Sequence, residues 1–483
     1  MFDSAGLDHR VAKALYRREE AKLRTALLNA QYDLKLDGRF AVLILIAGVE
    51  GAGKGETIHQ PNEWMDPRHI LTCGFAEPSD EERERPRLWR YWKALPPRGK
   101  IGVFFGAWHT EPILDRAQGA MSSAEFALRL DETVRLEKML CDEGMLLLKY
   151  WFHVSKKQQR KHLKSIGEKP LVPYGKFVAV AESFVRRTSA ADAPWIVVPG
   201  ADSRYRALTF GRHLLAAMRQ RLDAGARRRP AHRAPPLARP ADDLNVVRAL
   251  ALDQPMSRIA YKRHLRQWQG RLGELSRDPR LRSISVVAVF EGNDAAGKGS
   301  AIRRVTQALD ARYYRSIPVA APTEEERAQP YLWRFWRQLP RRGRFLLFDR
   351  SWYGRVLVER VERLTPEADW MRAYAEINDF EAAMVHHDIV LAKFWLAVSK
   401  DEQYRRFKAR EKSPFKRFKI TPEDWRNRKK WNEYETAVSD MVERTSSRIA
   451  PWTLVEANNK YFARIKVLKT LCQAMEDALG RVK

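Results

Sequence analysis

The sequence contains little cysteine and no long apolar run. Its three cysteines, Cys73, Cys141 and Cys472, lie far apart and form no CxxC pair, so neither a disulfide framework nor a thiolate zinc site is expected. The longest apolar strings, such as residues 40–47, are much shorter than the roughly 20 residues of a membrane-spanning helix. The chain does not open on a charged segment followed by an apolar core, as a secretory signal would. We therefore expect a soluble, cytoplasmic protein that has no membrane partner.

Acidic residues are scarce relative to basic ones. The chain has 88 Lys and Arg against 60 Asp and Glu, which leaves a net charge of +28. A cationic surplus of this size indicates an anionic partner, and nucleic acid, acidic lipid and polyphosphate all qualify. With 483 residues the chain exceeds the length of one ordinary core, so two domains are expected.

The chain repeats its own pattern after 244 residues. LWRYWKALPPRGK begins at Leu88 and LWRFWRQLPRRGR begins at Leu332, and 332 minus 88 is 244. The same shift places Lys54 on Lys298 and Trp151 on Trp395. A period this long indicates a duplicated domain, because stacked repeats are far shorter. The boundaries that follow are residues 1–222 for the first domain, 223–243 for an extended linker rich in proline and arginine, and 244–483 for the second domain.

Strand and helix patterns alternate within the second copy. Residues 284–290, ISVVAVF, form a continuous β-branched run that is typical of a parallel strand buried on both faces. Residues 344–348 and 389–398 are further predicted strands, with helical segments at 300–310 and 370–387 between them. This order predicts an α/β fold, with a mostly parallel sheet flanked by helices in each domain. Functional residues should then gather at the carboxyl ends of the strands.

A glycine-rich segment, GNDAAGKG at residues 292–299, follows directly after the first of these strands. Gly292, Gly297 and Lys298 fit the G-x-x-x-x-G-K frame of a phosphate-binding loop. In such a loop glycines let backbone N–H groups face phosphate, and the lysine and the helix N-terminus add positive charge. The alternative is a tight turn with a surface lysine. The position between a strand and a helix favours phosphate binding.

This loop departs from the usual motif in its acid and its hydroxyl. Gly299 stands where a Ser or Thr that helps to hold Mg²⁺ is usual, and Ser300 follows one position late. Asp294 would repel phosphate unless a cation lay between them. We therefore expect Asp294 to face Mg²⁺ directly or through water, with an Asx-type turn residue as the alternative.

A second block, FDRSWYGR at residues 348–355, follows another predicted strand. Asp349 ends the strand, as a Walker-B carboxylate does, and Arg350 supplies a bidentate cation for phosphate. A structural ion pair is the alternative, and the upstream loop favours catalysis.

A third block, residues 407–431, alternates cations with aromatic residues. Pro414 and Pro422 interrupt any long helix there. Such a segment can form a lid that closes over a phosphoryl donor and excludes water. The alternative is a solvated charged face, and the two preceding motifs favour the lid.

Taken together and in this order, the three blocks resemble the polyphosphate kinase 2 family. They read G-x-D-x-x-G-K-G at residues 292–299, D-R-S-W-Y-x-R at 349–355, and R-x-x-x-P-x-K-x-x-K with a following D-W and R-x-x-W in the lid. The lid positions are Arg410, Pro414, Lys416, Lys419, Asp424, Trp425, Arg428 and Trp431. The resemblance covers nearly the whole chain, because the duplicated arrangement is similar to the fused branch of the family, the polyphosphate:AMP phosphotransferases.

The resemblance implies a P-loop kinase-like fold with a helical lid, dependence on Mg²⁺ or Mn²⁺, and phosphoryl transfer from inorganic polyphosphate to a nucleoside monophosphate, AMP giving ADP. It implies catalytic roles for Asp294, Lys298, Asp349 and Arg350, with the two aspartates as metal ligands. The residues expected to bind phosphate or substrate are Gly292, Asn293, Gly297, Gly299, Ser300, Arg355, Lys408, Arg410, Lys416, Lys419 and Arg428. Family members commonly assemble, so a homo-oligomer is possible.

The first copy departs from the family pattern. Its loop, GVEGAGKG at residues 48–55, keeps the phosphate frame with Glu50 in place of the aspartate. The shift of 244 puts Phe105 and Gly106 where the second copy has its Walker-B acid and arginine, and LVPYGKFVAVAES replaces the cationic lid. A phenylalanine cannot bind a metal and a glycine cannot clamp phosphate. We predict that this copy has lost its chemistry and supports the fold, the assembly or the binding of long polymers.

Two other classes of protein share parts of this pattern. A nucleotide kinase that uses ATP would have the same loop and acid without needing so large a cation surplus. A basic P-loop protein that binds nucleic acid would also be rich in aromatic residues. The tryptophans recur in the repeated blocks, which indicates packing rather than base stacking, so no nucleic acid is expected. The motifs leave the acceptor open among AMP, GMP and ADP.

Overall fold

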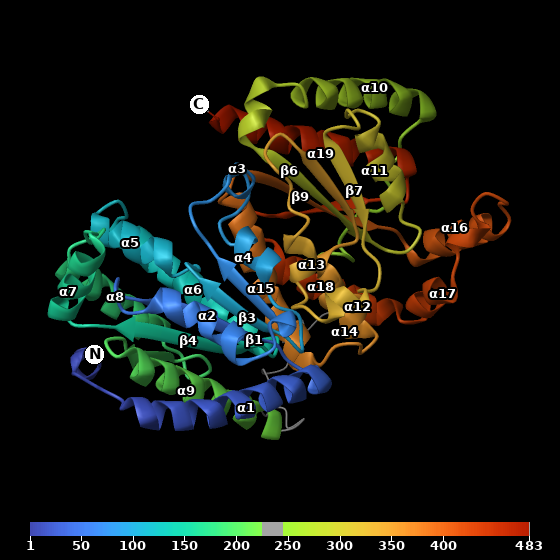
Figure 1. Cartoon of the computed structure of the whole chain (residues 1–483). Coiled ribbons are helices and arrows are strands. Elements are labelled where there is room, and N and C mark those ends of the chain that lie inside the picture. Colours follow the sequence, from blue (N-terminus) through green and yellow to red (C-terminus); the bar gives the residue numbers. More distant parts are fainter. Residues whose placement is uncertain (225–244, 483) are drawn as a thin grey trace. The chain divides into compact units, whose positions relative to one another are not determined.

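The computed structural model describes residues 1–224 and 245–482, in which helices and parallel strands alternate (Figure 1). The predicted linker at 223–243 lies outside the described residues except for Asp223, the last residue of a helix, and Ala224. The chain divides into two compact units. The first unit contains the first sheet and Pro322–Arg334, and the second unit contains the second sheet and Ser79–Trp89.

Each unit is built on one five-stranded sheet in which all pairs are parallel. The first sheet has the spatial order β2-β3-β1-β4-β5, with β1 (Val42–Gly48), β2 (Ile70–Gly74), β3 (Ile101–Phe105), β4 (Leu146–His153) and β5 (Trp195–Pro199). The second has the same order, β7-β8-β6-β9-β10, with β6 (Ser285–Gly292), β7 (Tyr314–Pro318), β8 (Phe345–Asp349), β9 (Ile389–Ala397) and β10 (Trp452–Glu456). The predicted α/β fold with two parallel sheets is confirmed.

The central strands of the second sheet are the ones that the sequence predicted. The segments 284–290, 344–348 and 389–398 appear as β6, β8 and β9, with ends that differ by one or two residues. These strands are almost entirely buried, so they carry the continuous apolar run that a parallel strand needs. The edge strands β7 and β10 were not predicted, because they are short and partly exposed and have no such run.

Helices precede, connect and follow the strands of both sheets. In the first half they are α1 (Lys13–Asp37), α2 (Lys54–Trp64), α3 (Asp80–Arg83), α4 (Trp89–Ala94), α5 (Thr110–Gln118), α6 (Ser123–Asp142), α7 (Lys156–Ile166), α8 (Tyr174–Thr188) and α9 (Ser203–Asp223). In the second half they are α10 (Arg258–Leu275), α11 (Lys298–Thr306), α12 (Glu324–Arg327), α13 (Trp333–Trp336), α14 (Val358–Val361), α15 (Glu367–Val385), α16 (Lys400–Glu411), α17 (Pro422–Lys429), α18 (Trp431–Thr445) and α19 (Lys460–Arg481). In the second unit α11 and α19 contact one face of the sheet, with α10 along α19, and α15 packs on β9 from the other face (Figure 1). Each sheet has its own apolar core.

A buried ion pair fixes the turn after β8. Lys393 on β9 donates to Glu381 on α15 at 2.7 Å, and Glu381 also accepts hydrogen bonds from the indole N–H of Trp352 at 3.0 Å and the hydroxyl of Tyr353 at 2.5 Å. The Trp and Tyr of the D-R-S-W-Y block are therefore structural. They hold in place the turn that carries Asp349 and its neighbour.

Within the described residues, no helix combines the length and the apolar content needed to cross a membrane.

Candidate active site

The loop between β6 and α11 is a tight turn that requires glycine. Gly292 has a φ of 149° and Gly297 a φ of 114°. A Cβ on Gly292 would lie 2.4 Å from the carbonyl oxygen of Leu396, so no side chain fits there. Helix α11 begins at Lys298, directly after Gly297. The N–H groups of its first turn therefore lie next to the loop, where a helix N-terminus can bind an anion.

Lys298 folds back onto this loop. Its Nζ donates to the carbonyl oxygen of Gly292 at 2.7 Å and to that of Asn293 at 3.3 Å. Both acceptors are neutral carbonyls, which phosphate oxygens can replace. The lysine is thus already positioned at the place where an anion would bind.

Three carboxylates lie near Lys298. Burial lowers the pKa of Lys298, and the negative charges of Asp294, Asp349 and Glu291 oppose that shift. Asp349 Oδ2 lies 3.7 Å from the position that a Cβ on Gly299 would occupy. The two predicted acids and the lysine therefore come together at the carboxyl ends of β6 and β8, as the parallel sheet predicts.

Arg350 has a strained backbone and faces the phosphate-binding loop. Its φ of 66° is left-handed, which costs a residue with a side chain about 1–2 kcal/mol. Its guanidinium pairs with Asp294 at 3.3 Å and not with its neighbour Asp349. Burial acts to lower the pKa of Arg350, yet the carboxylates of Asp294, Glu291 and Asp349 together raise it. Backbone strain of this kind is typical of functional positions.

Asp294 joins the loop to the segment predicted as a lid. Asn427 on α17 donates from Nδ2 to Asp294 Oδ2 at 2.9 Å, and Gln403 on α16 donates to the Asp294 carbonyl oxygen at 3.2 Å. The carboxylate hydrogen bonds that the structure describes come from side chains distant in sequence, Asn427 and Arg350, rather than from the local N–H groups of an Asx turn.

The lid consists of short helices separated at its prolines. Helix α16 ends before Pro414, and α17 begins at Pro422, with a 3-10 turn between them. Arg406 anchors the base of the lid. Its guanidinium donates to the carbonyl oxygen of Ala296 at 2.9 Å in the loop and to that of Asn458 at 2.9 Å after β10.

The predicted lid cations differ in their surroundings. Lys416 and Lys419 are exposed near the tip. Arg410 reaches the carbonyl oxygen of Lys419 at 3.5 Å, and Lys408 forms an ion pair of 3.0 Å within α16. Arg428 donates to the carbonyl oxygen of the first residue of α16. The exposed side chains present positive charge to solvent on the segment that contacts the loop.

Ser300 and Arg355 have protein partners. The hydroxyl oxygen of Ser300 accepts a hydrogen bond from Arg464 on α19 at 3.0 Å. Arg355 pairs with Glu359 at 2.9 Å and is only 14% exposed. The contacts that the structure describes for these two side chains are therefore with other side chains of the protein.

Sequence reasoning missed three residues of this site, Glu291, Arg406 and Asn427. Glu291 is 5% exposed, burial raises its pKa, and its carboxylate accepts from the hydroxyl of Ser351 at 2.8 Å. It could have been found as an acid at the end of a buried apolar strand. Arg406 and Asn427 carry no such signal, because only the fold brings the lid against the loop.

The first copy keeps the lysine and loses the other groups. Lys54 donates to the carbonyl oxygen of Gly48 at 2.6 Å, and burial lowers its pKa to about 8. Phe105 and Gly106 stand at the end of β3. Gly106 has a φ of 72°, so the left-handed turn persists there without an arginine. Glu50 accepts from the backbone N–H of Leu171 at 3.3 Å.

The two aspartates suit a magnesium ion. Among the residues that the structure describes, no group of three or more His, Cys, Asp and Glu side chains is arranged to hold a metal. Mg²⁺ does not require such a cage, because it usually keeps several waters and binds one or two carboxylates together with substrate phosphates. Asp294 and Asp349, whose charges both act on Lys298, fit that pattern.

Four features together define a P-loop phosphotransferase fold. They are the strand order that both sheets share, the glycine-rich loop after β6, the carboxylate at the end of the neighbouring strand β8, and the lid. The polyphosphate kinase 2 family matches residues 10–225 and 255–483, and the chain belongs to that family.

Relatives and a solved structure extend over the whole chain. A polyphosphate:AMP phosphotransferase from Pseudomonas aeruginosa is 54% identical over 100% of both chains. Another from Acinetobacter johnsonii is 36% identical over 96% of this chain and 98% of its own. A crystal structure described as a putative polyphosphate kinase 2 from Pseudomonas aeruginosa matches with a TM-score of 0.92 and 53% identity over 100% of both chains.

Proposed function

We propose that this protein transfers a phosphoryl group from inorganic polyphosphate to AMP, giving ADP, at the site in its second unit. The observation that carries the proposal is the convergence of Lys298, Asp294, Asp349 and Arg350 at one loop. Relatives similar to this chain over its full length bear the name polyphosphate:AMP phosphotransferase. The net charge of +28 suits a polyanionic donor.

The reaction is an in-line displacement. A phosphate oxygen of AMP attacks the terminal phosphorus of the polymer, the bond from that phosphorus to the bridging oxygen breaks, and a polymer shorter by one phosphate leaves. Lys298 exchanges its two carbonyl partners for phosphate oxygens, next to the N–H groups of α11. Arg350 stabilises the charge on the equatorial oxygens. The attacking oxygen is already anionic, so no strong general base is needed.

The lid holds the rest of the polymer. Its cations, Lys408, Arg410, Lys416, Lys419 and Arg428, neutralise successive phosphates, and closure excludes water that would otherwise hydrolyse the donor. Asn427 and Gln403 link that closure to Asp294 in the loop.

Asp294 and Asp349 are the proposed ligands of Mg²⁺, with Mn²⁺ as a possible substitute. The metal, when bound, would screen the carboxylates from the phosphate oxygens and neutralise charge on the transferred group. Asp294 would exchange its contact with Arg350 for this role and keep Asn427 on its other oxygen, which frees the guanidinium for phosphate.

The first unit has no part in the transfer step in this proposal. It lacks the acid and the arginine, and the segment in place of the cationic lid, LVPYGKFVAVAES, contains a single cation, Lys176. It supports the fold or the binding of long polymers.

A product assay tests the proposal. The purified full chain is incubated with AMP and either polyphosphate or ATP as the donor, with GMP and ADP as alternative acceptors, and nucleotides are separated by chromatography. ADP is expected with polyphosphate and AMP. Product with ATP alone would instead identify a nucleotide kinase. A bound oligonucleotide that polyphosphate cannot displace would identify a nucleic-acid-binding protein.

A further inference from the structure

Helix α7 of the first unit carries a dense set of cations and no acid. Its sequence, KKQQRKHLKSI, contains five lysines and arginines, and all of them are exposed. Gln159 and Leu163 are the buried residues of the helix and face the rest of the unit. The mechanism proposed above uses none of the cations, which are Lys156, Lys157, Arg160, Lys161 and Lys164.

These cations repel one another along the helix. Among the residues that the structure describes, none of the five forms an ion pair with an acid. Three pairs of them stand four residues apart, a spacing at which like charges destabilise a helix. The pairs are Lys156 with Arg160, Lys157 with Lys161, and Arg160 with Lys164. The first turn also has two lysines where the helix dipole favours acids. A bound polyanion would neutralise this repulsion.

The equivalent helix of the second unit has the acids that α7 lacks. The shift of 244 places Lys157 of α7 on Asp401 of α16. The next residue of α16, Glu402, pairs with Arg406 at 2.5 Å. Helix α16 thus has three acids against five cations, whereas α7 has five cations alone. The copy that has lost its chemistry therefore has the more cationic helix, so the charge of α7 is not explained by a role in transfer.

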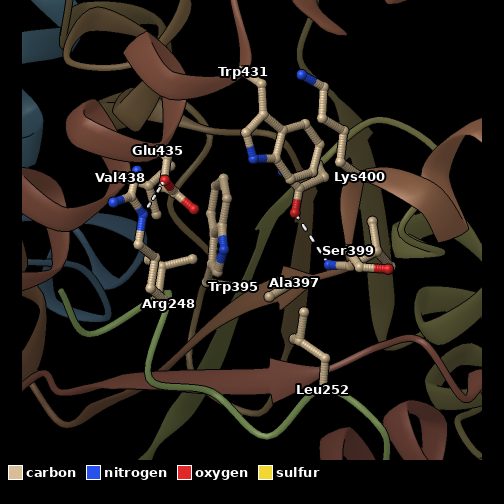
Figure 2. Close-up of a pocket in the computed structure, with 12 residues that line it drawn as sticks. Arg248, Leu252, Trp395, Ala397, Ser399, Lys400, Trp431, Glu435 and Val438 are labelled. Carbon is tan, nitrogen blue, oxygen red and sulfur yellow. Dashed lines mark hydrogen bonds and ion pairs between the residues drawn. The ribbon is translucent and has the colours of Figure 1, made fainter. Parts of the chain in front are cut away.

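The two helices also differ in their surroundings. Lys400, at the start of α16, lies at the edge of a cavity of about 190 Å³ that Trp431 and Glu435 of α18 also line (Figure 2). The ring of Trp425 on α17 packs on Phe407 of α16, with centroids 5.1 Å apart. Helix α16 is therefore in contact with the rest of the lid, whereas the cationic side of α7 is open to solvent.

Helix α7 lies against the glycine-rich loop that the first unit keeps. A Cβ on Gly51 in this loop would lie 3.0 Å from Cδ2 of His162 on α7. The loop follows β1 and the helix follows β4, and these two strands are parallel neighbours in the first sheet. The cations of α7 and a loop with the frame of a phosphate-binding turn therefore lie at the same end of the sheet.

The side chains of α7 favour an inorganic polyanion over a nucleic acid. Proteins that bind single-stranded nucleic acid combine a basic surface with aromatic rings on which the bases stack. Helix α7 contains no Phe, Tyr or Trp, and Arg160 stands where α16 has Tyr404. Four of its five cations are lysines, which act on phosphate as point charges. The helix thus offers charge without a surface for bases.

We propose that the exposed side of α7 is a second binding surface for inorganic polyphosphate, which holds the polymer without reacting with it. Its five cations neutralise successive phosphates, next to the loop at Gly51. The choice of polyphosphate rests on the proposed function, in which this polymer is the donor, whereas the surface itself rests on the charges of α7.

The test is a hydrogen-exchange footprint of the full chain with long-chain polyphosphate and without AMP. Polyphosphate should slow exchange in residues 156–166, because it removes the repulsion that destabilises the helix. Exchange should also slow at the transfer site, in residues 292–299 and 407–431. The two regions are read separately, so a failure at α7 is distinct from a failure of the proposed function.

The decisive variant combines Lys157→Gln, Arg160→Gln and Lys161→Gln. These side chains are exposed and glutamine is a good helix former, so the fold should be kept. The polymer concentration that gives half of the protection at 156–166 should rise at least tenfold. Its dependence on log salt should fall by about 2, because each contact to a single-stranded polyanion contributes about 0.7. Protection at the transfer site should stay.

A matched control removes the same charge from α1 of the same unit. It combines Lys13→Gln, Arg17→Gln and Lys22→Gln, all at exposed positions, and should leave the protection at 156–166 unchanged. An equal loss in this control would reduce the effect to net charge and overturn the proposal. So would a wild-type footprint confined to the transfer site, which needs no variant to fold. Protection at 156–166 by a single-stranded RNA at lower concentration than polyphosphate would assign the surface to nucleic acid instead.

Discussion

Asn427 on α17 donates a hydrogen bond to Asp294 in the phosphate-binding loop, with Nδ2 and Oδ2 2.9 Å apart. The same carboxylate pairs with Arg350 at 3.3 Å through its other oxygen. A single acid therefore connects the lid, the loop and the end of β8. A ligand that binds this carboxylate, such as a metal ion, therefore changes the contacts of the lid or of the turn after β8.

Loss of the lid contact should weaken closure. Asn427→Ala removes a hydrogen bond to a charged acceptor, worth about 1.5–3 kcal/mol, so transfer should fall at least tenfold. Hydrogen exchange should become faster in residues 412–430. The control is Asn432→Ala on the exposed side of α18, which should behave as the wild type in both measurements. Equal rates and equal exchange in the two variants would show that the Asn427 contact has no role in closure.

The Walker-B position should be required for chemistry but not for folding. Asp349→Asn keeps the shape of the side chain and removes its charge, and transfer should fall by roughly 10²–10³, the size seen when one transition-state stabiliser is lost. Circular dichroism and thermal unfolding should match the wild type. The paired variant in the first copy, Phe105→Asp, should leave turnover unchanged. Wild-type activity in Asp349→Asn would exclude a catalytic role for this acid.

Two variants of Arg350 should have the same loss of activity but different stabilities. Arg350→Gly and Arg350→Ala both remove the guanidinium, so kcat should fall by roughly 10³–10⁵ in each if the group acts as an arginine finger. Only glycine adopts the left-handed conformation at this position without strain. The free energy of unfolding should therefore be higher for Arg350→Gly than for Arg350→Ala, by about 1–2 kcal/mol. Chemical denaturation measures the difference. Equal stabilities would show that the backbone at this position carries no strain.

The loop lysine of the first copy should destabilise the fold near neutral pH. Burial lowers the pKa of Lys54 to about 8, so the unfolded chain binds more protons between about 8 and the ordinary value of 10.5. The contribution of Lys54 to the free energy of unfolding therefore rises with pH between these two values. Lys54→Met should raise the free energy of unfolding at pH 7, and the gain should shrink as the pH approaches 10.5.

The same substitution in the two copies should have opposite consequences for activity. Lys54→Met should keep transfer within about twofold, whereas Lys298→Met should lose at least 100-fold because the lysine contacts the phosphate oxygens. A loss in Lys54→Met as large as in Lys298→Met would contradict the assignment of chemistry to the second unit.

The buried lysine of each sheet should be needed for folding. Lys393→Met leaves Glu381 buried without its cation, and Lys149→Met does the same to Glu137 in the first unit. Breaking a buried pair on one side costs about 3–5 kcal/mol. Both variants should lower the melting temperature of their own unit. Lys149→Met, measured below that temperature, should keep the turnover of the folded protein, and a lost turnover would couple the first unit to the reaction.

The duplicated α/β architecture and the position of the loop were readable from the sequence because they depend on local patterns. The central strands β6 and β9 are buried on both faces and need continuous apolar residues, and the turn at Gly292 leaves no room for a side chain. The edge strands β7 and β10 escaped prediction because they are short and only partly buried, so they carry no continuous apolar run.

By itself, the sequence determined the fold, the repeat and the order of the motifs, since each can be read from short runs of residues compared along the chain. Only the tertiary structure decided that Asn427 bonds to Asp294 and that Arg350 pairs with this acid and not with its neighbour. These contacts join segments tens to more than a hundred residues apart. Their geometry follows from how the helices pack on the sheet, which no local pattern encodes.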